Sequence, residues 1–274
     1  MAADSQSKLV SRGAAADIAG SPLWYSDSGG PGVPVVFVHA NTGNGEAWGP
    51  QTGYFERAGF RTVVFDRRGW GRSPSLGPAS TRSAAEDLAG LADHLRLAAF
   101  HLVGIAGGAF VAIDFAAAYP DRIRSAVLAA SIGQLAEPEI EAFAKRIRID
   151  EIWPPASAAN RELSAGYRGR NPDGTGKWLA IEARSKRPGE SPQPLITPNT
   201  YLKLAAITVP VLVVAGGADL IAPPALMAIW APYISDHQFA TIDAAGHALA
   251  WEEPERFNTL VSRFIARRTE ETIR

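Results

Sequence analysis

The chain has 274 residues, 46% of them hydrophobic, and its 27 basic and 28 acidic residues leave a net charge of −1. This balance argues against a nucleic-acid or anionic-membrane partner, and the absence of cysteine excludes disulfides, thiolate metal sites and a cysteine nucleophile. The first residues lack a signal-peptide pattern, and no apolar run is long enough to span a membrane. We expect a cytoplasmic protein with a small-molecule ligand; whether it forms a homodimer is left open.

Apolar runs bounded by glycine and proline recur along the chain. They are continuous rather than alternating, which is typical of strands covered on both faces of a parallel sheet. The N-terminal part, through "SPLWYSDSGG", is expected to form an antiparallel hairpin at the edge of that sheet. The other predicted strands, in chain order, are 33–39, 61–66, 101–105, 125–130, 209–216 and 237–243.

Helical patterns lie between these strands. One face of 81–97 carries Ala84, Leu88, Leu91 and Leu95, and a second helix is expected to follow a glycine turn at 110–118. Further helices are expected at 223–230 and 254–265. The alternation of strand and helix predicts an α/β fold with a doubly wound, mostly parallel sheet.

Residues 133–200 break this alternation. They contain no predicted strand, many charges and prolines, and two short helical stretches at 139–149 and 176–186. We interpret 133–200 as a helical cap inserted over one end of the sheet, with a proline-rich return at its end. The core domain would then comprise 1–132 and 201–274.

The stretch "HLVGIAGGAF" (101–110) reads as a buried strand, a tight turn and a helix. Strand, turn and helix in this order usually carry the pattern G-x-S-x-G, in which the serine is a nucleophile at the apex of the turn. Here Gly104 and Gly108 hold the glycine positions, but the apex is Ala106. Small residues around such an apex are required because its backbone is strained.

Three further motifs accompany this turn, all near predicted strand ends. They are "VFVHANTGNGEAW" (36–48), "DRRGWGRS" (66–73) and the late pair "GGADLIAP" (216–223) with "AAGHALAWEEPERF" (244–257). In order and spacing the four motifs resemble the α/β-hydrolase superfamily, in particular its esterases, lactonases and enol-lactone hydrolases. The resemblance covers nearly all of the chain and implies the α/β-hydrolase fold.

The resemblance also implies roles for individual residues. Ala106 stands where the nucleophilic serine is expected, Asp219 would be the acid and His247 the base. The backbone N–H groups of Asn41 and Gly107 would form the oxyanion hole. A strand-end histidine, His39, and the glycines of 66–73 are interpreted as structural.

The residues expected to contact substrate are mostly apolar and aromatic. They favour a ring or an acyl group as substrate. Arginines of the cap, among them Arg146, Arg148 and Arg168, could bind a carboxylate, but the nearby acids favour a solvated surface of mixed charge. No metal and no cofactor are expected. The predicted lining is Ala40, Trp48, Phe110, Trp153, Tyr167 and Trp178.

An ester or lactone hydrolase with a Ser-His-Asp mechanism fits these motifs best, with alanine in place of the serine. The alanine has two explanations: a substitution made to trap a substrate, which the complete remaining motifs favour, or a natural serine-less receptor, binding protein or non-hydrolytic enzyme. Amide, C–C bond and haloalkane hydrolases of the same fold are further alternatives. A haloalkane dehalogenase would need an aspartate at the apex, although Asn41 and Trp48 resemble its loop.

Overall fold

A computed structural model describes residues 8–9, 11–77, 80–148, 157–187, 189–190 and 192–273 of the chain, with side chains as far as residue 267. The predicted strands are present and shift by no more than a few residues at their ends. They and the N-terminal hairpin are β1 (Gly13–Ile18), β2 (Ser21–Asp27), β3 (Pro34–Val38), β4 (Arg61–Phe65), β5 (Phe100–Ile105), β6 (Ile123–Ala129), β7 (Val211–Gly216) and β8 (His237–Ile242).

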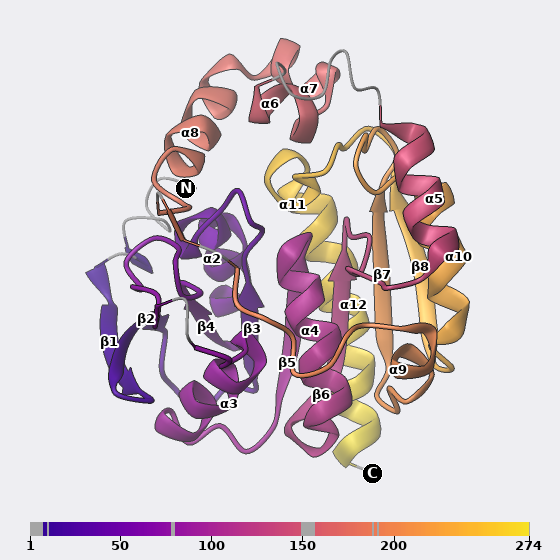
Figure 1. The fold of residues 1–274 in the computed structure, drawn as a ribbon. Helices are drawn as coiled ribbons and strands as arrows, with labels where there is room; N and C mark the ends of the chain where they lie inside the picture. The colour runs from indigo at the N-terminus through magenta and orange to yellow at the C-terminus, as the bar shows by residue number, and fades with distance from the viewer. Residues whose placement is uncertain are drawn as a thin grey trace.

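All eight strands form one sheet in the order β1-β2-β4-β3-β5-β6-β7-β8 (Figure 1). The hairpin of β1 and β2 lies at the edge, and β2 pairs antiparallel with β4. Every other pairing is parallel. The predicted doubly wound, mostly parallel α/β fold with an antiparallel edge hairpin is therefore confirmed.

The helices include all four that the periodicity predicted, as α3, α4, α10 and α12. The segment after β3 was not predicted to be helical, and it forms α2. The helices are α2 (Gly49–Arg57), α3 (Ala84–His94), α4 (Gly107–Ala118), α5 (Pro138–Ile147), α6 (Ala158–Glu162), α7 (Ala165–Arg170), α8 (Pro172–Glu182), α9 (Tyr201–Ala205), α10 (Pro224–Trp230), α11 (Leu249–Glu252) and α12 (Pro254–Ile273).

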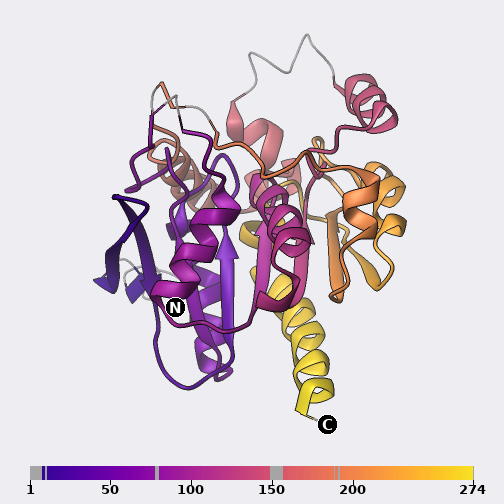
Figure 2. The ribbon, with the colours of Figure 1, turned by 60° about the horizontal axis from the view of Figure 1, so that its bottom comes forward.

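The sheet is covered on both faces, which explains its continuous apolar strands. On one face, α3, α4 and α10 pack in a cluster with Val36, Leu102 and Val213. On the other face, α2 and α12 pack in a cluster with Phe37 and Val103. Figure 1 shows α4 in front of the sheet and α12 behind it, and in the turned view of Figure 2 α12 lies at the bottom. Every residue of β5 and β7 is buried, as expected of central strands in a three-layer fold.

Between β6 and β7 the described residues form helices and no strand. The first of these helices, α5, joins the main core through Ile140. In contrast, α6, α7 and α8 have a small cluster of their own around Leu163, Tyr167 and Trp178. Figure 1 places them above the ends of the strands. We call residues 157–187 the α6–α8 segment.

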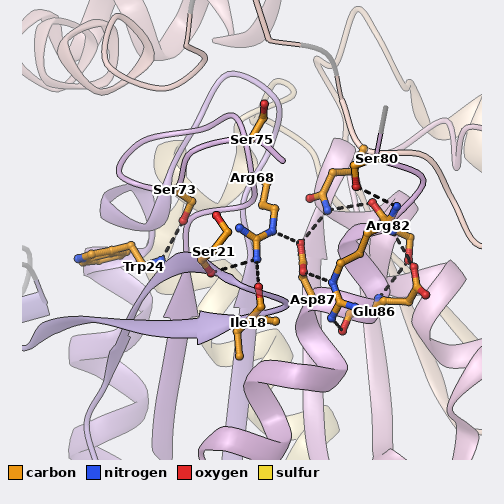
Figure 3. Close-up of polar contacts among 12 residues, drawn as sticks. Ile18, Ser21, Trp24, Arg68, Ser73, Ser75, Ser80, Arg82, Glu86 and Asp87 are labelled. Carbon is orange, nitrogen blue, oxygen red and sulfur yellow. Dashed lines mark hydrogen bonds and ion pairs between the residues drawn. The ribbon is translucent and has the colours of Figure 1, made fainter. Parts of the chain in front are cut away.

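The turn after β4, residues 66–73, is fixed by a buried ion pair. Arg68 donates from Nε to Asp87 Oδ2 at 2.8 Å and from Nη2 to the Ile18 carbonyl at 2.6 Å. Arg82 Nε donates to the other Asp87 oxygen at 2.6 Å (Figure 3). Ser73 accepts the Trp24 N–H at 2.9 Å. These bonds join the edge hairpin, the turn and α3, so Arg68 has a structural role.

Candidate active site

Ala106 occupies the apex between β5 and α4 in a strained conformation. Its φ of 51° and ψ of −114° are unfavourable for a residue with a Cβ atom. The surrounding backbone holds it there, because the Ala106 N–H donates to Ala129 O at 2.9 Å and the Ala106 carbonyl accepts from Ser131 Oγ at 3.0 Å. The turn therefore has the geometry that exposes a nucleophile, with a methyl group at the apex.

Two glycines make this geometry possible. A Cβ on Gly104 would lie 2.4 Å from Gly108 O, and a Cβ on Gly108 would lie 2.1 Å from Val38 O. These contacts are with backbone atoms of the sheet and helix, which cannot move aside as a side chain can. Both positions therefore require glycine for the close approach of α4 to the strands.

Asp219 and His247 form a buried hydrogen-bonded pair. Asp219 follows the end of β7 and His247 follows β8, so adjacent strands bring them together. His247 Nδ1 lies 2.8 Å from Asp219 Oδ2. The other Asp219 oxygen accepts the backbone N–H groups of Ile221 and Ala222 at 2.7 and 2.9 Å. This arrangement places the proton of a neutral imidazole on Nδ1 and leaves Nε2 as a base.

The pair shifts the ionisation of both partners. Burial opposes the charged form of each, but the opposite charge and the hydrogen bond outweigh it. The pKa of Asp219 is consequently lowered and that of His247 raised. Together they keep the carboxylate ionised and favour the imidazolium that a proton-accepting histidine must become.

Two further acids surround His247, and no sequence pattern pointed to them. Glu162, at the end of α6, accepts a hydrogen bond from Thr42 Oγ1 at 2.6 Å. Glu252, in α11, accepts the backbone N–H groups of Gly246 and Ser164 at 3.0 and 3.1 Å. Burial raises the pKa of both acids, and their charges contribute to the raised pKa of His247. Glu252 ties the histidine loop to the α6–α8 segment, whereas Glu162 faces a cavity.

The first cavity, of about 40 Å³, lies between the sheet and the α6–α8 segment. It contains His247 and the carboxyl group of Glu162 within a mainly apolar wall. Of the predicted substrate contacts, Ala40, Trp48 and Trp178 line it. The complete lining is His39, Ala40, Thr42, Gly43, Ala47, Trp48, Ile105, Glu162, Trp178, Ile181, His247, Ala248, Ala250 and Trp251.

The remaining predicted contacts lie elsewhere. Phe110 lines a second cavity, of about 250 Å³, on the other side of the loop after β3. Tyr167 is buried in the cluster of the α6–α8 segment, and its hydroxyl accepts a hydrogen bond from Asn171 at 3.3 Å. Trp153 lies outside the described residues. Of the cap arginines, Arg168 binds Asn160.

The side-chain amide of Asn41 lies against Gly107, the second of the two predicted oxyanion residues. A Cβ on Gly107 would meet the Asn41 amide oxygen at 2.3 Å. Gly107 is the first residue of α4 and has no acceptor within the helix. Within the described part of the chain, neither backbone N–H donates to another protein group. Both donors are therefore available to a ligand, and the α4 N-terminus adds positive potential there.

His39 has a structural role, as its position at the end of a strand suggested. Its Nδ1 donates to the Ala40 carbonyl at 2.7 Å, and its Nε2 accepts the Arg67 backbone N–H at 2.9 Å. Burial, with the nearby Arg67 charge, lowers its pKa well below the usual range. The ring is thus neutral, and both of its nitrogens are engaged. Among the described residues, no group of three or more acids and histidines could hold a metal ion, and no helix is long and apolar enough to cross a bilayer.

Comparison with known proteins agrees with this geometry. A family model described as "Alpha/beta hydrolase family" matches residues 35–260. BpoC of Mycobacterium tuberculosis, which carries the name of a non-heme bromoperoxidase, is 31% identical over 89% of this chain and 97% of its own length. The 3-oxoadipate enol-lactonase 2 of Acinetobacter baylyi is 26% identical over 85% of this chain and 88% of its own.

Solved structures show the same similarity. A thermophilic esterase from Thermogutta terrifontis superposes with a TM-score of 0.78 at 27% identity, over 93% of this chain and 98% of the esterase. The enol-lactonase from Burkholderia xenovorans superposes with a TM-score of 0.76 at 24% identity, over 92% and 100% of the two chains. At that identity, the second comparison concerns the fold alone.

Proposed function

Because the chain belongs to the alpha/beta hydrolase family, we propose that its site is built for a carboxylic ester or a lactone, with residue 106 in the nucleophile position. The observation that carries this proposal is the strained apex at Ala106 after β5, together with the His247–Asp219 pair after β7 and β8. The N–H groups of Asn41 and Gly107 donate to no described protein group. Strain of this kind persists where function requires it. Similarity to an esterase and an enol-lactonase supports the same substrate class.

The proposed chemistry follows from the positions of the groups. With serine at 106, the hydroxyl adds to the ester carbonyl carbon while His247 Nε2 accepts its proton. Asp219 holds the imidazole and stabilises the imidazolium, and the N–H groups of Asn41 and Gly107 bind the oxyanion. His247 then gives the proton to the leaving alcohol, and water hydrolyses the acyl-enzyme by the same steps in reverse order.

With alanine at 106, no acyl-enzyme forms. The pocket, the base and the two oxyanion donors remain, so the chain as it stands binds its ligand and turns it over slowly. We propose that residues 133–200 act as the cap over this site, with Trp178 contacting the ligand from α8. Trp48 and Ala40 contact it from the loop after β3.

The decisive experiment is the substitution Ala106→Ser. A panel of aryl esters and lactones is assayed with both forms, and the serine form is expected to hydrolyse at least one substrate with kcat/KM raised by about 10³-fold or more. The matched control is the double variant Ala106→Ser with His247→Gln, which retains the hydroxyl without its base and should lose most of the gain. If the serine form shows no gain on any substrate, the hydrolase proposal is wrong.

A second candidate is a natural serine-less protein that binds its ligand or catalyses proton transfer without a covalent intermediate. The buried Glu162 favours it, since this carboxyl group lines the same cavity as His247 and burial raises its pKa. A carboxyl group whose pKa is raised by burial and a histidine base on one cavity could exchange protons with a ligand. This candidate predicts that the Ala106 form is as active as the serine form, and that Glu162→Gln reduces its activity.

A further inference from the structure

The second cavity is built around a charged group that no described residue pairs. Arg67 is 5% exposed and lines this cavity together with Asn41 and Gly107. Its Nη2 donates to Asn41 Oδ1 at 2.8 Å, and its guanidinium lies over the Trp70 ring at 4.5 Å. Its Nε has no hydrogen-bond partner. Within the described residues, no carboxylate forms an ion pair with Arg67.

Burying the Arg67 guanidinium in this way destabilises the folded protein unless another group compensates its charge. A guanidinium offers five N–H donors, and one of them is used by a side chain here. Burial lowers the pKa of Arg67 to about 9, so the group remains protonated at neutral pH. A buried charge without a partner is unfavourable, whereas a planar carboxylate can accept two parallel hydrogen bonds from a guanidinium.

The one acid that lines the cavity is already engaged. Asp114 forms an ion pair with Lys203 Nζ and accepts the Ile196 N–H at 2.8 Å. Its charge is therefore balanced from outside the cavity. The rest of the wall combines Gln134 and Gln193 with apolar residues such as Phe110, Val111 and Leu195. A cavity of about 250 Å³ that offers one cation without a described counter-charge, amide groups and an apolar part suits a small organic anion.

From this cavity we infer that the natural ligand carries a carboxylate on a short apolar or aromatic body, and that Arg67 binds this carboxylate. Asn41 connects Arg67 to the start of α4, because its amide oxygen accepts a hydrogen bond from Arg67 and lies against Gly107. Arg67 and Gly107 line the same cavity, so a ligand held by Arg67 lies in the cavity that the first residue of α4 borders. The carboxylate receptor is a residue of the core turn, rather than the cap arginines considered from the sequence.

The test compares benzoate with benzamide, which has nearly the same shape without the charge. Binding to the unaltered Ala106 chain is measured by isothermal titration calorimetry. We expect benzoate to bind at least tenfold more tightly than benzamide. Arg67→Met should abolish this preference by weakening benzoate alone, while Arg67→Lys should retain part of it. The control Arg170→Met removes an exposed arginine that pairs with Glu253 and should change neither affinity.

Several outcomes would overturn the inference. These are equal binding of the two probes, binding of neither, or a benzoate preference that survives Arg67→Met in a variant with an unchanged melting curve. Because the ligand class belongs to the site proposed above, it rests on the proposed function, but the binding test needs no turnover. Benzoate binding through Arg67 with an inactive Ala106→Ser form would reject the hydrolase alone. Ester hydrolysis by the serine form without benzoate selectivity would reject the role of Arg67 alone.

Discussion

Arg67 and Arg68 are neighbours in one turn, and both are buried, yet their charges are compensated in different ways. Arg68, 1% exposed, has an ion pair with Asp87 and a hydrogen bond to the Ile18 carbonyl. Arg67, 5% exposed, has one side-chain hydrogen bond, to the neutral amide of Asn41. One guanidinium faces the edge hairpin and the other faces a cavity beside the elbow.

The difference separates structural from ligand-binding charges. Where the chain supplies a counter-charge, as it does for Arg68 and for Asp219, the ionised group holds elements of the fold or the site in place. Where no described carboxylate pairs with the group, as for Arg67, the group lines a cavity. Buried charges are costly unless paired, so an unpaired one beside a cavity is best explained by a ligand.

The largest effect is expected when the compensated arginine is removed. Arg68→Met leaves Asp87 with Arg82 and Gln193 as partners, but it removes two buried hydrogen bonds of a charged group, to Asp87 and to the Ile18 carbonyl, at about 1.5–3 kcal/mol each. Arg67→Met removes a charge without a counter-charge and should change the free energy of unfolding by less than about 1 kcal/mol. Urea denaturation of both variants measures the two values. Equal losses would contradict the distinction between the two arginines.

Much of the fold could be predicted from the sequence because the same pattern, an apolar strand followed by a turn and a helix, recurs along the chain. The strands before the elbow and the acid motif, β5 and β7, are continuous buried runs. The histidine motif follows β8, an edge strand that is largely exposed. The carboxyl ends of parallel strands meet at one edge, which is why the acid and the base that the resemblance implies, Asp219 and His247, lie together. The glycines of the elbow had a steric reason that the backbone contacts of Gly104 and Gly108 bear out.

The rest depends on contacts that no local pattern records. "DRRG" contains Arg67 and Arg68 side by side, and nothing in these letters says which one faces a cavity. Glu162 lies in a helix of five residues, and its partner Thr42 is 120 positions away. The helix α2 contains two glycines and a proline, which weaken the periodicity that would predict it.

The next largest effect is expected when the negative charge of Asp219 is removed from beside His247. Asp219→Asn takes away the charge and the charged hydrogen bond that outweigh burial, so the pKa of His247 should fall. His247 has a raised pKa in the folded protein, and its contribution to stability is complete below about pH 6.5 and is lost as the pH rises through the folded pKa. Asp219 has a lowered pKa, and its contribution is present above about pH 3.8.

The loss of stability in Asp219→Asn should therefore be largest between about pH 4 and pH 6.5, at about 2 kcal/mol, and should shrink toward alkaline pH. Denaturation curves across this range and NMR titration of the His247 ring provide the measurements. The variant His247→Gln serves as the control, because adding Asp219→Asn to it should have little pH-dependent effect between about pH 5 and pH 8. A loss that grows toward alkaline pH would reject the ion pair.

The smallest change in stability is expected at Glu162. Its carboxyl group accepts a hydrogen bond from the Thr42 hydroxyl, and no described basic side chain forms an ion pair with it. Its pKa is raised because burial disfavours the charged form. The folded protein therefore binds the Glu162 proton more tightly than the unfolded chain does, and the cost of ionisation grows as the pH rises above about 4.5. Glu162→Gln removes this cost, keeps an oxygen for Thr42, and should stabilise the protein by on the order of 1 kcal/mol near pH 8 and less near pH 4.

Thr42→Val supplies the opposite change at the same contact. It deletes the hydroxyl that donates to Glu162, a hydrogen bond that lowers the pKa of this carboxyl group. The variant should therefore lose on the order of 1 kcal/mol near pH 8, where the carboxylate needs its donor most, and less in acid. Measuring the unfolding free energies of both variants near pH 8 and near pH 4 tests whether the ionised Glu162 is compensated within the chain. If Glu162→Gln also destabilises the protein near pH 8, the carboxylate is compensated within the chain, as Asp219 is, and a ligand is not needed to explain its place on the cavity wall.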